Sequence, residues 1–345
     1  MAEVFMLGES TFRRIDKALF NALWMGEHCL GRTAVGPLRK RLADRMLTRV
    51  QGRPTGKLVS VDKVRNLSAE DFKSRYSDRS IPVVFEGAAL DWPCTSKWTP
   101  DFIADQYGDD EALLGERKPG KEFGHEVQMT TLREVVRSLQ AGGKKYARFH
   151  PLLKKHPELV DDFDVRFLSS LKSKIGGHLT FNMFLGGKNT KTSLHAAGAE
   201  NLFVEVHGRK HWRIYPTSLN PAINASVIRT PYFMTDLDPD KPDENRYAMF
   251  PFVDGFEVTL EPGDILYNPS FFWHQVENLS DAIGVGVRWI SLDAMLRASP
   301  TMTLLTMLST SPPIWEASKY DGDFIRVFAA DKRSKAVRRL SLNAD

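Results

Sequence analysis

Apolar positions in the first fifty residues recur with the period of an amphipathic helix. Between residues 11 and 26 they fall every three or four positions, at Phe12, Ile15, Leu19, Phe20, Leu23 and Trp24. This spacing places them along one helix face. Residues 37–50 predict a second helix, with Pro37 suited to its first turn, before glycine and proline interrupt the pattern at 52–56. We therefore expect a helical, basic N-terminal extension over residues 1–58.

Helix starts and a buried strand alternate in the next part of the chain. Ser68 is followed by an acidic residue three positions later, as at a helix N-terminus. Thr99 and Pro100 predict another helix start, and residues 131–140 place their apolar side chains on one helix face. Residues 81–85 (Ile-Pro-Val-Val-Phe) predict a buried strand.

From residue 144 to residue 292 the pattern changes to short strands separated by turn residues. Nine strands are predicted, at 144–149, 178–185, 192–196, 202–207, 210–215, 256–260, 264–268, 271–277 and 283–291. Strands of this length and spacing are typical of a sandwich or barrel. The segment 216–255 is rich in Pro, Asn and Asp, and its length favours a functional insertion. Helical patterning returns after Ser291, which predicts a C-terminal helical region over 293–345.

The composition is that of a soluble globular protein, with 42% hydrophobic and 26% charged residues. Cys29 and Cys94 are the only cysteines, and neither has a metal-binding or redox spacing, which favours a reducing compartment. Charged residues between 13 and 17 interrupt the pattern that a signal peptide requires. With no apolar stretch of transmembrane length, we expect an intracellular, cytoplasmic protein.

Positive charge is concentrated near the N-terminus. Residues 32–57 contain eight basic residues and one acid, which gives this segment a charge of +7. Such a segment predicts either contact with an anionic partner or a solvated helix face.

Several polar motifs occur in the strand-rich region. Thr192-Ser-Leu-His195 is followed by Asn201 and by Gly208-Arg-Lys210, then by Pro262-Gly-Asp264 and Trp273-His274. In this order they resemble the JmjC/cupin-like family of Fe(II)- and 2-oxoglutarate-dependent oxygenases. The resemblance covers roughly residues 60–292 and is closest to the asparaginyl hydroxylase that inhibits hypoxia-inducible factor. It implies a mainly β fold, a double-stranded β-helix (cupin or jelly-roll) barrel, with helical extensions at both ends. The domain would span 59–292, with its barrel core at 144–292.

The resemblance implies that His195 and His274 bind iron. Two histidines and one carboxylate hold non-haem iron while leaving positions open for co-substrate and oxygen. The family carries the carboxylate two residues after the first histidine, where this chain has Ala197. A methyl group cannot bind a metal, so this position departs from the family pattern.

Several interpretations of Ala197 are compatible with the sequence. Glu200 or water could complete the metal site. Chloride could occupy the position, since related 2-oxoglutarate-dependent halogenases have a small residue there. The site could also be catalytically silent, which would make the domain a binding module. An engineered substitution would leave the same sequence.

The co-substrate positions resemble the family more closely. Thr192 and Lys210 match the residues that hold the distal carboxylate of 2-oxoglutarate, and Tyr146 matches a third contact. Asn201 matches a polar residue near the metal-bound end of the co-substrate. Arg288 stands where the family has an asparagine, so it predicts a second charge for a co-substrate or substrate acid.

The prediction is therefore an enzyme that uses Fe(II), 2-oxoglutarate and O2 to hydroxylate a protein side chain or small metabolite by hydrogen abstraction. Halogenation with chloride and a silent binding module are the alternatives. His207 and His211 flank a glycine turn on predicted strands and are interpreted as structural. In the resembling hydroxylase, helices after the barrel form a dimer interface, which predicts either a homodimer or an internal helical cap here.

Overall fold

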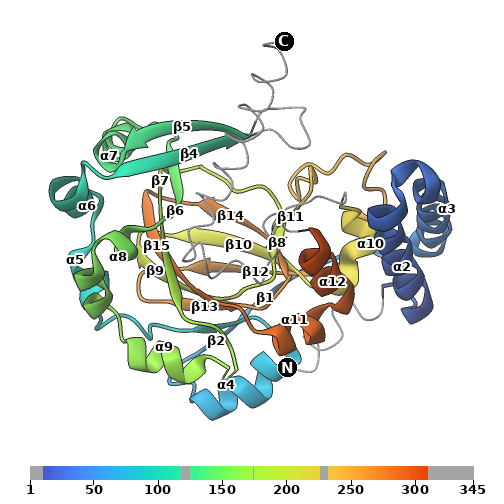
Figure 1. Cartoon of the computed structure of the whole chain (residues 1–345), viewed down its shortest axis with the longest axis horizontal. Helices are drawn as coiled ribbons and strands as arrows, with labels where there is room; N and C mark the ends of the chain where they lie inside the picture. The colour runs from blue at the N-terminus through green and yellow to red at the C-terminus, as the bar shows by residue number, and fades with distance from the viewer. Residues whose placement is uncertain (1–10, 118–124, 174, 226–231, 310–345) are drawn as a thin grey trace, which may run out of the picture.

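Two β-sheets form the centre of the molecule, and helices lie outside them (Figure 1). The computed structural model describes residues 11–117, 125–173, 175–225 and 232–309. The six-stranded sheet has the order β1 (Leu58–Ser60), β12 (Gly255–Leu260), β10 (Lys210–Tyr215), β14 (Trp273–Asn278), β8 (His195–Ala197) and β11 (Tyr232–Met234). The nine-stranded sheet has the order β2 (Asp62–Val64), β3 (Val83–Phe85), β13 (Ile265–Asn268), β9 (Glu200–His207), β15 (Ala282–Trp289), β7 (Thr180–Gly186), β6 (Tyr146–His150), β4 (Glu111–Arg117) and β5 (His125–Thr131). This architecture confirms the predicted mainly β, jelly-roll fold with flanking helices.

All nine predicted barrel strands have counterparts, and the predicted strand at 81–85 corresponds to β3. The sequence pattern did not indicate β1, β2, β11 or the β4–β5 hairpin. Three of these strands have only three residues, which is too short to show an alternating pattern. β1 and β2 form because they pair in parallel with β12 and β3, a tertiary contact rather than a local preference.

The interior between the sheets is aromatic. Alternate residues of β9 point to opposite faces, so Phe203 packs inward against Trp212 of β10 at a ring-centroid distance of 5.0 Å. Leu202 and Val204 belong to a separate cluster on the outer face of the nine-stranded sheet. Both faces of β9 are therefore buried, and only the inner one can reach a ligand in the barrel.

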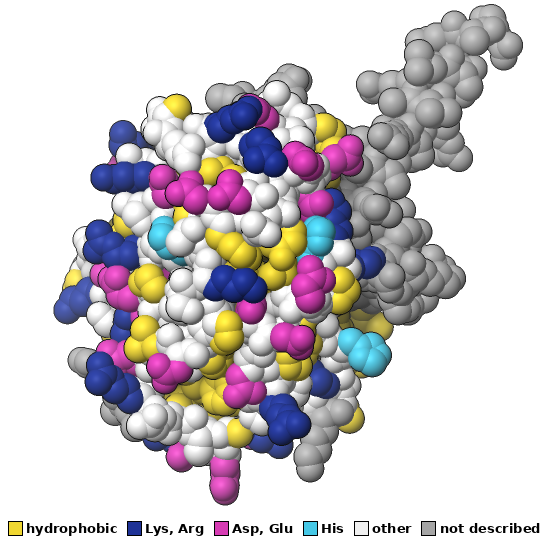
Figure 2. Space-filling model, turned by 90° about the vertical axis from the view of Figure 1, so that its left-hand side faces the viewer, with side chains coloured by type: hydrophobic (Ala, Val, Ile, Leu, Met, Phe, Trp, Pro, Cys, Tyr) yellow, Lys and Arg dark blue, Asp and Glu magenta, His cyan; other side chains and the backbone are white. Residues whose placement is uncertain are grey.

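Short helices cover the outer face of the nine-stranded sheet. They are α4 (Ala69–Arg75), α5 (Pro93–Lys97), α6 (Pro100–Tyr107), α7 (Leu132–Gln140), α8 (Leu152–Lys155) and α9 (Val165–Leu171). The predicted starts are confirmed, because the Ser68 and Thr99 side chains accept hydrogen bonds from backbone N–H groups of α4 and α6. Figure 2 shows basic and acidic side chains interspersed on the face where α5, α6 and α8 lie.

Short 3-10 helices connect these elements at Ser77–Arg79, Pro157–Asp162, Thr217–Leu219 and Phe250–Phe252. The second of them contributes Asp162, whose carboxylate accepts hydrogen bonds from the Trp98 indole at 2.7 Å and from Lys97 at 3.1 Å. This buried contact ties α5 to the segment before α9.

The terminal helices pack on the other side of the barrel. α2 (Arg14–Leu30) and α3 (Arg32–Val50) lie beside α10 (Asn220–Ile223) (Figure 1). Two further helices, α11 (Leu292–Ala298) and α12 (Pro300–Ser309), follow the last barrel strand along the chain. Trp24 is buried against Phe233 of the insertion, with ring centroids 5.6 Å apart. The predicted start of the second helix was wrong: α3 begins directly after Gly31, whose φ of +88° ends α2, so Pro37 lies inside the helix.

Parts of the predicted regions lie outside the described residues. They are residues 1–10 of the N-terminal extension, residues 226–231 of the insertion, and residues 310–345 of the C-terminal region, which include Ile314 and Trp315. In α12, Met302 and Leu305 are buried while Leu304 and Leu308 are exposed. The homodimer stays a prediction. No helix within the described ranges has the length and apolarity needed to cross a membrane, and Cys29 and Cys94 are free thiols.

Phe72 should be a major contributor to the stability of the sheet and its helices. Its ring lies 5.1 Å from Phe85 and 4.9 Å from Tyr267, and it is 1% exposed. We expect Phe72→Ala to lower the free energy of unfolding by about 3–5 kcal/mol, measured by urea denaturation. The exposed Met129→Ala is the control, expected within about 0.5 kcal/mol of the unsubstituted protein. Equal effects of the two substitutions would contradict this assignment.

Candidate metal and co-substrate site

His195 and His274 lie side by side inside the barrel. They are direct partners in the pairing of β8 with β14. Their ring centroids are 4.2 Å apart, with an angle of 53° between the ring planes. The Trp212 indole stacks on His274 at 5.4 Å and 22°. The structure therefore brings together the two histidines that the sequence predicted as metal ligands.

Hydrogen bonds to the backbone orient both imidazole rings. Nδ1 of His195 lies 2.8 Å from the Ser193 carbonyl, and Nδ1 of His274 lies 2.9 Å from the Phe272 carbonyl. A carbonyl oxygen only accepts, so each Nδ1 carries the proton and each Nε2 keeps its lone pair. Burial lowers the pKa of His195 to about 4 and that of His274 well below its usual range. The rings are therefore neutral, the form that binds a metal ion.

Asn268, which the sequence analysis did not single out, supports His274. Its amide nitrogen is placed 3.2 Å from His274 Nδ1, and its Oδ1 is buried without a partner. Because Nδ1 already carries a proton, the exchanged amide orientation, with Oδ1 facing the ring, satisfies both groups. Asn268 is thus an outer contact that helps to fix the ring.

Ala197 leaves the third ligand position without a side-chain donor. It is the last residue of β8, and its carbonyl accepts a hydrogen bond from Phe271 N at 2.7 Å. The suggestion that Glu200 could replace the carboxylate is wrong. Glu200 points to the outer face of β9, where it accepts a hydrogen bond from the Tyr267 hydroxyl at 2.5 Å. No group of three or more His, Cys, Asp or Glu able to hold a metal occurs in the described ranges.

Lys210 is the centre of a buried polar chain. It is 0% exposed, and its Nζ donates to Asn278 Oδ1 at 2.7 Å. Asn278 Nδ2 in turn donates to Thr190 Oγ1 at 2.8 Å. Thr192 Oγ1 accepts from Val276 N at 2.9 Å, which leaves its own hydroxyl proton available for a ligand. Lys210 and Thr192 therefore contribute to one interior, and the structure adds Asn278 to the predicted set.

Arg288 and Asn201 are joined directly. Arg288 Nε donates to Asn201 Oδ1 at 3.2 Å. The guanidinium lies over the rings of Phe149 and Phe184, 4.7 and 5.3 Å from their centroids. Its positive charge contributes to lowering the pKa of both metal-site histidines. Arg288 is thus a held cation close to the histidine pair, rather than a solvated strand charge.

Tyr146 lies on the Lys210 side of the barrel. Lys210 Nζ is 5.8 Å from its ring centroid. Burial raises the pKa of the Tyr146 hydroxyl to about 12, so it remains a neutral donor at physiological pH. His211, by contrast, contacts Thr259 and Glu257 on the outer side of β10, which agrees with its interpretation as structural.

The sequence of this chain is similar to those of known proteins. Residues 69–292 match a family model described as a cupin-like domain. The chain is 26% identical to lysine-specific demethylase 8 of Xenopus tropicalis, over 67% of this chain and 53% of that protein. It is 26% identical to lysine-specific demethylase JMJ30 of Arabidopsis thaliana, over 82% of this chain and 68% of that protein. It is 25% identical to tRNA wybutosine-synthesizing protein 5 of Mus musculus, over 67% of this chain and 78% of that protein.

These relatives do not support the particular closeness to an asparaginyl hydroxylase that the motifs predicted. The chain spans about half the length of the frog demethylase. Their names describe different activities, lysine-specific demethylation in one case and tRNA wybutosine synthesis in another. The comparisons therefore leave open which substrate this chain takes.

The two histidines should decide metal binding, with Ala197 limiting its strength. Loss of even an outer contact to a metal ligand changes affinity about 10- to 100-fold. We therefore expect His274→Ala to weaken Co(II) binding at least that much, and Ala197→Asp to tighten it at least tenfold, measured by calorimetry. His211→Ala on the outer face is the control and should bind as the unsubstituted protein does. Equal affinity of the Ala197→Asp variant and the unsubstituted protein would place the ion elsewhere.

Proposed function

We propose that this chain, which belongs to the cupin-like domain family through its match over residues 69–292, is an Fe(II)- and 2-oxoglutarate-dependent oxygenase with a two-histidine metal site. One observation carries the proposal. Strand β14 pairs with β8 on one side and with β10 on the other, and these three strands present a neutral histidine pair and a fully buried lysine to the same barrel interior. A metal ligand and a carboxylate anchor are the two features that such a co-substrate requires.

The residues present fit a metal ion held from one side. His195 and His274 would hold it through Nε2, since each Nδ1 is committed to a backbone carbonyl. Bound Fe(II), together with 2-oxoglutarate and O2, would supply the oxidant that removes a hydrogen atom from the substrate. The missing carboxylate at Ala197 leaves one more position for a ligand that the protein does not provide.

The protein's own task is to bind and orient the co-substrate. Lys210 is committed to Asn278 by one hydrogen bond and retains two N–H donors for the distal carboxylate of 2-oxoglutarate. Thr192 and the neutral Tyr146 hydroxyl are further donors for the same carboxylate. Phe184, Phe203 and Trp212 line the interior and exclude water. In such surroundings a charge-assisted hydrogen bond is stronger than at the surface.

Halogenation is a second candidate, and two observations favour it. Ala197 leaves room at the metal position where the family has a carboxylate. The charge of Arg288 acts on both histidines, so an anion beside the metal would meet a positive potential. Chloride would fit these surroundings, and so would a substrate carboxylate. Either activity could act on a protein side chain or a small metabolite.

An anaerobic titration with Fe(II), then 2-oxoglutarate, then chloride tests the proposal by visible absorption. A charge-transfer band on addition of 2-oxoglutarate is the expected result. A shift of that band with chloride, lost in Ala197→Asp, would favour halogenation over hydroxylation. No band at any concentration would contradict the enzyme proposal and favour a silent binding module.

Some of the basic side chains in segment 32–57 form ion pairs within the protein, so fewer of them can contact a partner than the charge of +7 suggests. Arg39 is buried in an ion pair with Glu27 at 3.0 Å, and Arg49 pairs with Asp16 at 2.5 Å. Part of the charge therefore stabilises the packing of α3 on α2. We propose contact with an anionic partner only for the exposed residues of this segment, such as Arg41 and Arg45.

Lys210 should determine co-substrate affinity. A hydrogen bond to a charged group is worth about 1.5–3 kcal/mol, so we expect Lys210→Met to weaken 2-oxoglutarate binding about 10- to 100-fold. Calorimetry on the Mn(II)-loaded protein measures this without turnover. Lys188→Met, an exposed lysine near the same strands, should bind as tightly as the unsubstituted protein. An unchanged affinity in Lys210→Met would refute the anchor.

A further inference from the structure

Glu205 is an acidic side chain inside the barrel that the site described above does not use. It lies in β9 and is 0% exposed. Among the described residues, neither of its carboxylate oxygens has a hydrogen-bond partner. It shares its strand face with Asn201 and Phe203, so it points into the interior rather than towards the helices. An unpartnered carboxylate in this position requires an explanation.

The geometry places Glu205 next to the lysine anchor. Its neighbour in β15 is Gly284, on the interior face. A Cβ atom at Gly284 would lie 3.2 Å from Lys210 Cε and 2.4 Å from Phe203. Glycine is thus needed there for Lys210 and Phe203 to cross the interior beside Glu205. Lys210 nevertheless donates its hydrogen bond to Asn278 and not to Glu205.

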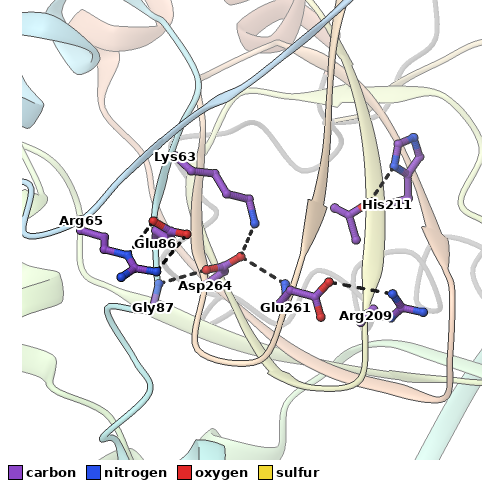
Figure 3. A network of polar contacts seen from close by, with 9 residues as sticks. Lys63, Arg65, Glu86, Gly87, Arg209, His211, Glu261 and Asp264 are labelled. Atoms are coloured by element: carbon purple, nitrogen blue, oxygen red, sulfur yellow. Dashed lines mark hydrogen bonds and ion pairs between the residues drawn. The ribbon is translucent and has the colours of Figure 1, made fainter.

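Asp264, a second buried carboxylate at this end of the barrel, provides the contrast. Figure 3 shows its carboxylate between Lys63, Gly87 and Glu261. It accepts hydrogen bonds from Lys63 Nζ at 2.7 Å, from Gly87 N at 3.0 Å and from Glu261 N at 3.1 Å. Three donors suit an ionised carboxylate. Glu205 has none of these contacts, although the backbone N–H of Glu205 bonds to the carbonyl of Asp264.

The charge of Glu205 is therefore costly in this environment. Burial raises the pKa of its carboxyl group well above the usual range, and the nearby Asp264 and Glu261 raise it further. Lys210 acts in the opposite direction but does not compensate for burial. A neutral carboxylic acid differs from a carboxylate in one respect that matters here, because it has an O–H donor.

We propose that Glu205 is a binding residue for the co-substrate, and that as a neutral acid it donates a hydrogen bond to the ligand carboxylate held by Lys210. This inference rests on the proposed function. The protein then offers that carboxylate an ammonium and an acidic O–H, and Glu205 gains the partner that it lacks. Ionisation of Glu205 weakens binding of the ligand. It places a second negative charge beside the ligand carboxylate and offsets the attraction of the Lys210 ammonium.

The proposal makes binding depend on pH. The groups that face Glu205 are Lys210 from β10, Tyr146 from β6, and Asp264 and Glu261 from the turn between β12 and β13; β15 presents the uncharged Gly284. The ligand binds the form in which Glu205 is protonated. Affinity is therefore constant below the pKa of Glu205 in the ligand-free protein and falls up to about tenfold per pH unit above it.

The Glu205→Gln substitution distinguishes a loss of affinity caused by ionisation of Glu205 from one caused by titration of Lys210. Glutamine has the same shape and a permanent N–H donor, and Lys210 is present in both proteins. The measurement is the dissociation constant of 2-oxoglutarate for the Mn(II)-loaded proteins, by calorimetry between about pH 6 and pH 9. We expect the ratio of the dissociation constant of the unsubstituted protein to that of the Glu205→Gln variant to be near one wherever Glu205 is protonated. Above the pKa of Glu205 this ratio should rise by up to about tenfold per pH unit. Glu261→Gln, which removes an exposed charge nearby, should show no such rise.

Each outcome decides the question. A ratio near one at every pH, with Glu205→Met binding as tightly as both, would mean that Glu205 does not contact the ligand. A large constant ratio would mean that it is ionised throughout. Both outcomes overturn the inference and leave the proposed function intact. A ratio near one with weaker binding by Glu205→Met, which has no donor, would support a Glu205 that donates throughout the range. Absence of 2-oxoglutarate binding in every protein would overturn both. If the variant does not fold, calorimetry of the unsubstituted protein in buffers of different ionisation enthalpy decides. Where affinity falls with rising pH, binding should take up about one proton, and a fall in affinity without proton uptake would refute the proposal.

Discussion

The pairing of β14 with β8 and β10 is the constraint on which the site depends. Its register sets His274 opposite His195 on one side and opposite Ile214 on the other. Because side chains alternate across a strand, the same register directs His274, Val276 and Asn278 into the barrel together with Lys210 and Trp212. A shift of one residue would turn all of them outward. The predicted metal ligands and the proposed carboxylate anchor are thus positioned by one set of backbone hydrogen bonds.

The ionisable groups inside this barrel are held in different ways. Arg288 is fixed by Asn201 and by two aromatic rings, and Lys210 by Asn278. Glu205 lacks a hydrogen-bond donor among the described residues. A buried polar group without a partner is costly, and the proposed hydrogen bond from a neutral Glu205 to a ligand carboxylate would remove that cost.

The surrounding helices contribute stability to the barrel. The cluster around Phe72, Phe85 and Tyr267 fixes α4 to the nine-stranded sheet, and Asp162 links α5 to the segment before α9. On the other side, Trp24 fixes the N-terminal helices to the insertion. These contacts lie outside the barrel interior, so they set its shape without entering the site.

The sequence by itself determined the nine barrel strands, the histidine pair and the absence of a carboxylate at Ala197, and it singled out Lys210 as the proposed anchor, because each depends on local spacing or on a motif. It did not determine the roles of Glu200 and Glu205. Both faces of β9 are buried, so its residues show no alternation of apolar and polar positions from which the inward face could be deduced. Only pairing with β13 and β15 decided that Glu200 turns outward to Tyr267 and Glu205 inward to the lysine. The short strands β1 and β2 likewise exist only through their tertiary partners.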